Sequence, residues 1–214
     1  MLRKRGFFSS ATNIIIVLNI IFFLIFFPIL IISKGSFVDY IAIKPENILH
    51  GKYLWTFITS MFMHGGPFHL FANMFTLFFI GNLIEQIIGK KRYLLFYLLS
   101  GLAASIFFII FSFIFTSDFS AYAVGASGSI FALAGLMMIL TPNLPVYLMF
   151  IPLPVKMKYA VPILLIGLWL ISLTGSIAIG NTAHLGGAIV GLFYGLYLKS
   201  KYPRNVMMLN RYVR

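Results

Sequence analysis

Residues 122–133 read Tyr-Ala-Val-Gly-Ala-Ser-Gly-Ser-Ile-Phe-Ala-Leu, and this stretch decides the fold because a loop of small residues becomes an apolar segment at a serine between two glycines. Small residues, serine included, are common where membrane helices touch. Taken alone, the Gly-x-Ser-Gly pattern at residues 125–128 therefore fits helix packing as well as it fits chemistry. The rest of the sequence has to decide between the two interpretations.

The composition identifies the solvent around this stretch. Of 214 residues, 61% are hydrophobic and 9% are charged, so a water-soluble globule of this size cannot bury all of its apolar surface. The chain is expected to be an integral membrane protein in a lipid bilayer. Its net charge of +12 lies between apolar runs, which membrane orientation explains better than nucleic-acid binding does. The absence of cysteine excludes thiolate catalysis and Cys-based metal sites.

Six apolar runs, each ended by charge, proline or small polar residues, predict six transmembrane helices. They cover about residues 12–33, 68–89, 93–116, 127–141, 159–174 and 182–199. The first run is too long for a signal-peptide core and is interpreted as a retained anchor. We expect an all-α, polytopic membrane domain at 12–199, between a basic N-terminal segment at 1–11 and a basic tail at 200–214. The proline-rich connection at 142–158 is expected to lie against the membrane without a continuous helix.

The basic residues predict the direction of the helices. If the N-terminus is cytoplasmic, Lys34, Lys44 and Lys52 are the only ones of the 16 Lys and Arg residues that lie outside, which satisfies the positive-inside rule. Both termini are then cytoplasmic, and the plasma membrane is the expected location. The external loop at about 34–67 contains an apolar stretch and is expected to lie in the membrane interface.

Polar residues of the membrane segments gather at one depth. His69 and Asn73 are four residues apart and share a helical face, while Ser127 and His184 open the fourth and sixth runs. These runs go inward from the external side, so the four side chains lie at one level. The fourth run, roughly 15 residues, reaches only about 22 Å as a helix, against a hydrocarbon core of about 30 Å. Ser127 therefore lies below the surface, beside protein or a water-filled cavity.

Close helix packing can bring two of these residues together. Ser127 and His184 are expected to touch, so that a neutral imidazole can take the serine proton. The Ser127 backbone N–H at a helix N-terminus, with side-chain donors from His69 and Asn73, can stabilise an oxyanion. The glycines that permit this close packing are Gly128, Gly187 and Gly191.

The three motifs together resemble those of the rhomboid family of intramembrane serine proteases. The likeness covers roughly residues 50–199 and includes His-x-x-x-Asn at 69–73, Gly-x-Ser-Gly at 125–128 and Ala-His-Leu-Gly-Gly-x-x-x-Gly at 183–191. The resemblance implies a six-helix, rhomboid-like fold. It also implies a serine endopeptidase, without cofactor or metal, that cleaves single-pass transmembrane proteins near the external face through an acyl-enzyme.

The resemblance assigns a role to each matching position. It implies that Ser127 is the nucleophile and His184 the general base of a dyad that has no third acid. His69, Asn73 and the Ser127 amide would form the oxyanion hole. Phe131, one turn after Ser127, falls where the family usually has an aromatic side chain that packs on the catalytic histidine.

Several alternatives stay open beside this hypothesis. A catalytically silent, rhomboid-like protein that binds membrane clients would share the fold, although such relatives typically lack the serine or the histidine. A transporter or channel would predict inverted repeats and further midplane charges, which the sequence does not contain. A metalloprotease is disfavoured because the chain has no His-Glu-x-x-His motif.

Other polar residues are expected to have structural roles. Ser129 is predicted to pack between helices with its hydroxyl bonded to backbone. His64 is interpreted as a structural or interfacial histidine that reaches water through the neighbouring glycines. Glu85 lies near Lys90, which favours an interfacial ion pair. Thr56 stands where rhomboids usually have an arginine, so the anchoring of the external loop differs from the family pattern.

Overall fold

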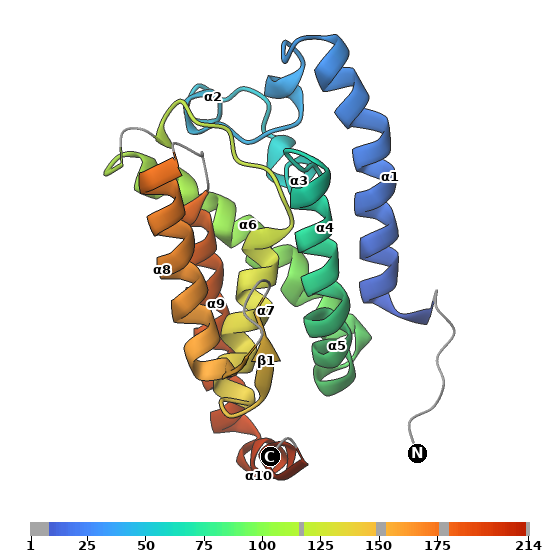
Figure 1. The fold of residues 1–214 in the computed structure, drawn as a ribbon, viewed down its shortest axis with the longest axis vertical. Helices are drawn as coiled ribbons and strands as arrows, with labels where there is room; N and C mark the ends of the chain where they lie inside the picture. The colour runs from blue at the N-terminus through green and yellow to red at the C-terminus, as the bar shows by residue number, and fades with distance from the viewer. Residues whose placement is uncertain (1–8, 116–117, 149–152, 176–179, 213–214) are drawn as a thin grey trace.

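The structure is a computed structural model, and it describes residues 9–115, 118–148, 153–175 and 180–212. Within these residues the chain is mostly helical, and the long helices run side by side (Figure 1). Four of the basic residues counted for the positive-inside rule lie outside the described ranges, namely Arg3, Lys4, Arg5 and Arg214, and so does Pro152 of the proline-rich connection.

Each of the six apolar runs is helical in the described residues. The corresponding helices are α1 (Ala11–Ile32), α4 (Pro67–Thr76) with its continuations η3 (Leu77–Gly81) and α5 (Asn82–Ile88), α6 (Lys90–Ser112), α7 (Ser127–Leu140), α8 (Met157–Gly175) and α9 (Asn181–Lys201). By length and composition, four described segments can cross a membrane, and α7 is a shorter apolar helix. The four are Ala11–Ile32, Pro67–Ile88, Lys90–Ser112 and Met157–Thr174. The chain is thus a helical membrane protein, while six spans and cytoplasmic termini stay predictions.

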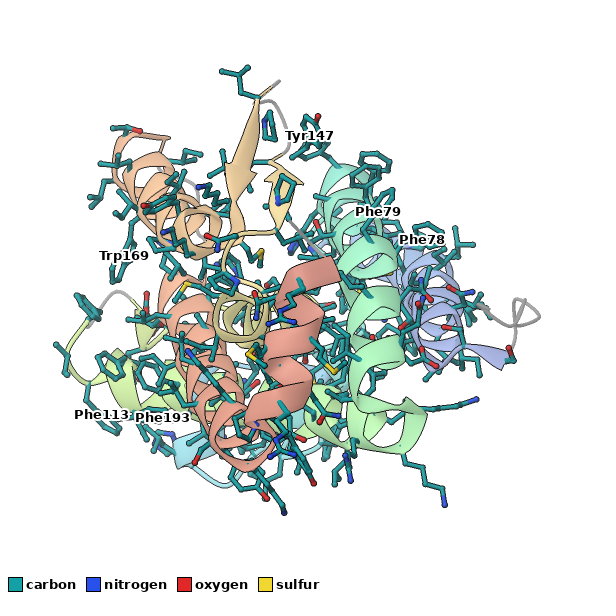
Figure 2. The ribbon with its side chains drawn as sticks, turned by 90° about the horizontal axis from the view of Figure 1, so that it is seen from below. Phe78, Phe79, Phe113, Tyr147, Trp169 and Phe193 are labelled. Atoms are coloured by element: carbon teal, nitrogen blue, oxygen red, sulfur yellow. The ribbon has the colours of Figure 1, made fainter. Side chains whose placement is uncertain are left out.

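Large apolar side chains point outward around the helices, as the labelled residues in Figure 2 show. Phe79 and Phe193 are 58% and 69% exposed. They lie on different sides of the molecule, so the exposed apolar surface is not confined to one face. Further exposed aromatic side chains are Phe78, Phe113, Tyr147 and Trp169. A surface of this kind is stable against lipid tails and unfavourable in water. The fold therefore agrees with the membrane environment that the composition predicts.

The inner connection and the C-terminal tail contain structure that the sequence analysis did not predict. The proline-rich connection forms a two-stranded antiparallel sheet, β1 (Pro145–Tyr147) and β2 (Pro154–Lys156), so the fold is not purely α. The tail contains a further helix, α10 (Pro203–Tyr212). Asn210 Nδ2 on α10 donates to the Leu140 carbonyl oxygen at 2.7 Å, which satisfies one of the free carbonyls at the end of α7.

The external loop carries three short helices, η2 (Val38–Tyr40), α2 (Pro45–Leu49) and α3 (Thr56–Thr59). Trp55 Nε1 donates to the Tyr40 carbonyl oxygen at 2.9 Å, and Thr59 Oγ1 donates to the Ile41 carbonyl oxygen at 2.9 Å. Thr56 Oγ1 bonds locally to the Tyr53 carbonyl oxygen at 2.7 Å. Residues beside Thr56 therefore anchor the loop where the family usually has an arginine.

Glu85 caps the N-terminus of α1 from inside the protein. Its carboxylate is 2% exposed and accepts hydrogen bonds of 2.9 Å from the backbone N–H groups of Ala11 and Thr12. The hydroxyls of Ser10 and Thr12 donate to the same group at 2.8 and 2.9 Å. A carboxylate at a helix N-terminus is favoured by both the free N–H groups and the helix dipole. Glu85 is therefore a buried helix cap, while its predicted interfacial ion pair stays a prediction.

Helices α7 and α9 touch through their backbones. A Cβ atom added at Gly187 would collide with the Gly128 carbonyl oxygen, and one added at Gly191 would collide with the Ala132 carbonyl oxygen. Side chains larger than hydrogen cannot fit between backbones at this spacing. The predicted glycine contact is therefore present, and it holds α7 directly against α9.

We predict that Gly191→Ala destabilises the protein, because the new methyl group has to push α9 away from α7. Overpacking of this kind costs about 1–3 kcal/mol, and thermal unfolding in detergent measures it. Gly167→Ala on α8 is the matched control, because a Cβ atom there meets nothing within 4 Å. An equal melting temperature for Gly191→Ala and Gly167→Ala would contradict the backbone contact.

Candidate active site

Ser127 and His184 meet where α7 and α9 begin. The distance between Ser127 Oγ and His184 Nε2 is 2.7 Å, which is that of a strong hydrogen bond. A neutral His184 ring that carries its proton on Nδ1 accepts this bond at Nε2 from the Ser127 hydroxyl. His184 is 8% exposed, and its Nδ1 has no hydrogen-bond partner within the described residues. Two residues of different helices thus form the donor and acceptor pair that proton transfer requires.

Phe131 fixes the orientation of the imidazole. Its ring lies 4.7 Å from the His184 ring, centroid to centroid, with an angle of 23° between the planes. Both Phe131 and Ser127 belong to α7, one turn apart. The same helix therefore supplies the hydroxyl and the surface on which its partner stacks.

His69 directs a donor toward the same place. Its Nδ1 accepts a hydrogen bond of 3.2 Å from the Gly65 backbone N–H, so a neutral ring carries its proton on Nε2. A Cβ atom built on Gly125 would lie 3.1 Å from His69 Nε2 and 3.6 Å from Ser127 Oγ. The Nε2–H edge thus faces the corner of the chain between Gly125 and Ser127.

Asn73 lies one turn farther along α4 on the same helical face as His69. Its Nδ2 donates to the His69 carbonyl oxygen at 2.8 Å and keeps a second N–H group. The side chain is 6% exposed, and its Oδ1 has no partner within the described residues. The structure brings Ser127, His184 and His69 together, whereas it links Asn73 to this group through His69.

The loop before α7 is held in an unusual conformation at Gly125. This residue has φ +122°, a region that favours glycine, and its N–H donates to the Ser60 carbonyl oxygen at 2.8 Å. Two residues earlier, Ala123 exchanges backbone hydrogen bonds of 2.9 and 3.1 Å with Ile43 of the external loop. These bonds satisfy loop backbone groups and fix where α7 begins, with the free N–H of Ser127 in its first turn.

Two neighbouring polar residues have other roles. Ser129 Oγ donates to the Tyr97 carbonyl oxygen at 2.8 Å, which agrees with its predicted packing role. His64 is fully buried, and its ring lies 5.1 Å from the His69 ring in an edge-on arrangement. The expectation that His64 reaches water is therefore wrong, because its side chain is fully buried in the protein.

The site also depends on residues that the sequence analysis did not single out. The backbone groups of Gly65 and Ser60 set the His69 tautomer and the loop position, and no side-chain pattern announces a backbone contact. Within the described part of the chain, no three His, Asp or Glu side chains cluster as ligands of a metal ion.

Comparison with known proteins connects this geometry to one family. The model of the rhomboid domain matches residues 51–201, a range that contains the whole Ser127, His184 and His69 arrangement. RHOMBOID-like protein 1 of Arabidopsis thaliana is 33% identical over 157 residues, which are 72% of this chain and 37% of that protein. RHOMBOID-like protein 6, mitochondrial, of the same plant is 32% identical over 162 residues, 73% of this chain and 48% of that protein.

The relatives differ in location and activity, as their names state. One of them is named mitochondrial, and another is Inactive RHOMBOID-like protein 8 of Arabidopsis thaliana, 41% identical over 58 residues, 27% of this chain and 16% of that protein. This chain spans less than half the length of these relatives.

We predict that Gly125→Ala slows the reaction of Ser127 with a fluorophosphonate probe. The new methyl group is strained at φ +122° and lies about 3 Å from the His69 ring, so the loop and the ring have to move. A loss of about ten-fold or more is expected from such a shift at the reacting atoms. Gly66→Ala is the control, because its Cβ atom meets nothing within 4 Å. An unchanged rate for Gly125→Ala would contradict the described corner.

Proposed function

Because this chain belongs to the rhomboid family, we propose that it is an intramembrane serine endopeptidase that cleaves transmembrane proteins near the external face of the bilayer. The family is one of membrane-embedded proteins that act on transmembrane substrates. The observation that carries the proposal is the 2.7 Å hydrogen bond between Ser127 Oγ and His184 Nε2. A chain with only 9% charged residues has this pair inside a protein that lipid surrounds.

In the proposed mechanism, Ser127 Oγ attacks the carbonyl carbon of the scissile peptide bond while its proton moves to His184 Nε2. The carbonyl oxygen becomes an oxyanion, which accepts hydrogen bonds from the Ser127 backbone N–H and from His69 Nε2–H. The second N–H of Asn73 is the third proposed donor. His184 then returns the proton to the leaving amine nitrogen, and the ester on Ser127 remains.

Water completes the proposed cycle. His184 Nε2 accepts a proton from the water molecule as its oxygen attacks the ester carbonyl, and the same proton then goes to the departing Ser127 Oγ. The products are a carboxylic acid, whose proton passes to solvent or to the released amine, and an amine, and the enzyme returns to its first state. In the proposed cycle His184 accepts and returns a proton twice, once in acylation and once in deacylation. The stacked Phe131 ring supports both steps because it keeps the imidazole in one orientation.

Family membership supports a location in a membrane and transmembrane substrates, but it does not identify the membrane or the individual substrate. Membrane embedding is supported, but one relative is named mitochondrial, so the plasma membrane expected from the sequence is not carried over. Single-pass transmembrane proteins stay the proposed substrates, because a single apolar helix reaches a buried site from within the bilayer.

A catalytically silent client-binding protein is the second candidate, because one relative is named inactive. The presence of a hydrogen-bonded serine and histidine favours the protease. A silent protein would bind transmembrane clients without cleaving them, so one experiment separates the two functions.

We predict that the purified protein, reconstituted in liposomes, cleaves a model transmembrane substrate, and that Ser127→Ala and His184→Ala each lower the rate by about 10³-fold or more. Ser129→Ala is the matched control and stays within about three-fold, because its hydroxyl bonds to the Tyr97 carbonyl oxygen and a single lost hydrogen bond has a modest effect. Cleavage that survives in both dyad variants would refute the mechanism. Substrate binding without cleavage by the unchanged protein would establish the silent alternative.

A further inference from the structure

Asp118 and Thr182 join the segments that lead into the nucleophile and the base. Thr182 Oγ1 donates to Asp118 Oδ2 at 3.1 Å. We propose that Asp118 is a positioning residue for His184, which holds the first turn of α9 against the loop that leads into Ser127. This inference rests on the proposed function and adds a residue that none of the three motifs contains.

The first turn of α9 needs an anchor because it is the part of the helix with the fewest intrahelical bonds. The first N–H groups of a helix lack intrahelical acceptors, and helix ends fray. His184 is the fourth residue of α9, whereas the collision point with the α7 backbone is Gly187, one turn farther in. The general base therefore lies between the locked part of α9 and its free end.

The loop between Asp118 and Ser127 is held in place by backbone hydrogen bonds to the external loop. Ala123 is paired with Ile43 through two backbone hydrogen bonds, and Gly125 donates to the Ser60 carbonyl oxygen. Glu46 N–H donates to the carbonyl oxygen of Phe119, the residue after Asp118, at 3.1 Å. The carboxylate thus belongs to a loop that the external segment holds in place, and a bond from Thr182 transfers this restraint to α9.

For this contact, the Asp118 oxygen that accepts the Thr182 hydroxyl is more important than the negative charge of the carboxylate. Burial raises the pKa of the Asp118 carboxyl, and the Thr182 hydrogen bond opposes that shift in part. A neutral amide oxygen at the same place still accepts the Thr182 hydroxyl and carries no desolvation cost of a charge. Asn is therefore expected to replace Asp118 well, whereas Ala is not.

Asp118 does not act as the third member of a Ser-His-Asp triad. Its bond goes to Thr182 Oγ1, two residues before His184, and His184 Nδ1 has no hydrogen-bond partner within the described residues. The proposed effect is on where the imidazole lies, and substrate affinity is expected to stay the same.

The test compares Asp118→Ala, Thr182→Val and the double variant in liposomes, with substrate cleavage and fluorophosphonate labelling of Ser127 as readouts. Each single variant is expected to lower kcat and the labelling rate by about ten-fold, with KM within about two-fold, because a small displacement of the base slows the chemical step. The labelling endpoint, which counts folded sites, stays that of the unchanged protein. The rate of the double variant is expected to lie within about two-fold of the rate of either single variant, because each single substitution removes the same hydrogen bond.

Conservative variants and a matched control complete the test. Asp118→Asn and Thr182→Ser keep an acceptor and a donor, so they recover rates within about three-fold of the unchanged protein. Thr174→Val is the matched control for Thr182→Val, because the Thr174 hydroxyl bonds only locally, to the Leu170 carbonyl oxygen of α8 at 2.8 Å, and its removal leaves the rate unchanged.

Three results would overturn the inference. They are an unchanged kcat in Asp118→Ala, losses that multiply in the double variant, and a lower labelling endpoint at an unchanged rate, which indicates a purely structural role. An unchanged protein that neither cleaves nor labels would instead overturn the proposed function.

Discussion

The backbone contact between α7 and α9 is the constraint on which the rest of the structure depends. A Cβ atom at Gly187 would collide with the Gly128 carbonyl oxygen. Ser127, next to Gly128, and His184, one turn before Gly187, then face each other at 2.7 Å. Lipid gives little apolar driving force for helix association, so small residues and close packing have to supply it. The same contact that stabilises the bundle therefore also sets the geometry of the site.

The short length of α7 places Ser127 below the membrane surface, but it also buries the backbone of the preceding loop, which costs free energy. The 14 residues of α7 are too few to cross the bilayer, so the preceding loop has to enter the protein, where each free backbone group costs several kcal/mol. Gly125, Ala123 and their partners Ser60 and Ile43 satisfy this need with backbone hydrogen bonds. The buried polar atoms that keep no partner within the described residues include atoms of His64, Asn73, Asn181 and His184. Asn73 and His184 belong to the site, and the His64 ring lies beside His69.

The contact between Ser127 and His184 could be predicted because each residue lies in a short motif at one end of an apolar run. Three such motifs, each at the predicted outer end of a helix, placed Ser127, His184 and His69 at one depth, and the structure brings these side chains together. Contacts with residues distant in sequence were not predicted. Glu85 has Lys90 nearby in sequence, which suggested an ion pair, whereas the capping hydrogen bonds of Glu85 come from Ser10 and Thr12 at the start of α1. The hydrogen bond between Asp118 and Thr182 joins a loop to the first turn of α9, and none of the three motifs contains either residue. The pairing of β1 with β2 follows prolines, which only exclude a helix.

The central claim is that an imidazole beside position 127 accepts a proton from the group there, and the absence of cysteine in this chain allows a direct measurement. Ser127→Cys introduces a single thiol, whose alkylation rate reports the fraction of thiolate, and a neighbouring histidine raises that fraction. We expect alkylation at pH 7 to fall by about ten-fold or more when His184→Ala is added to Ser127→Cys, because the thiol pKa then returns to or above its usual value near 8.5. Equal alkylation rates in the single and double variants would contradict the account.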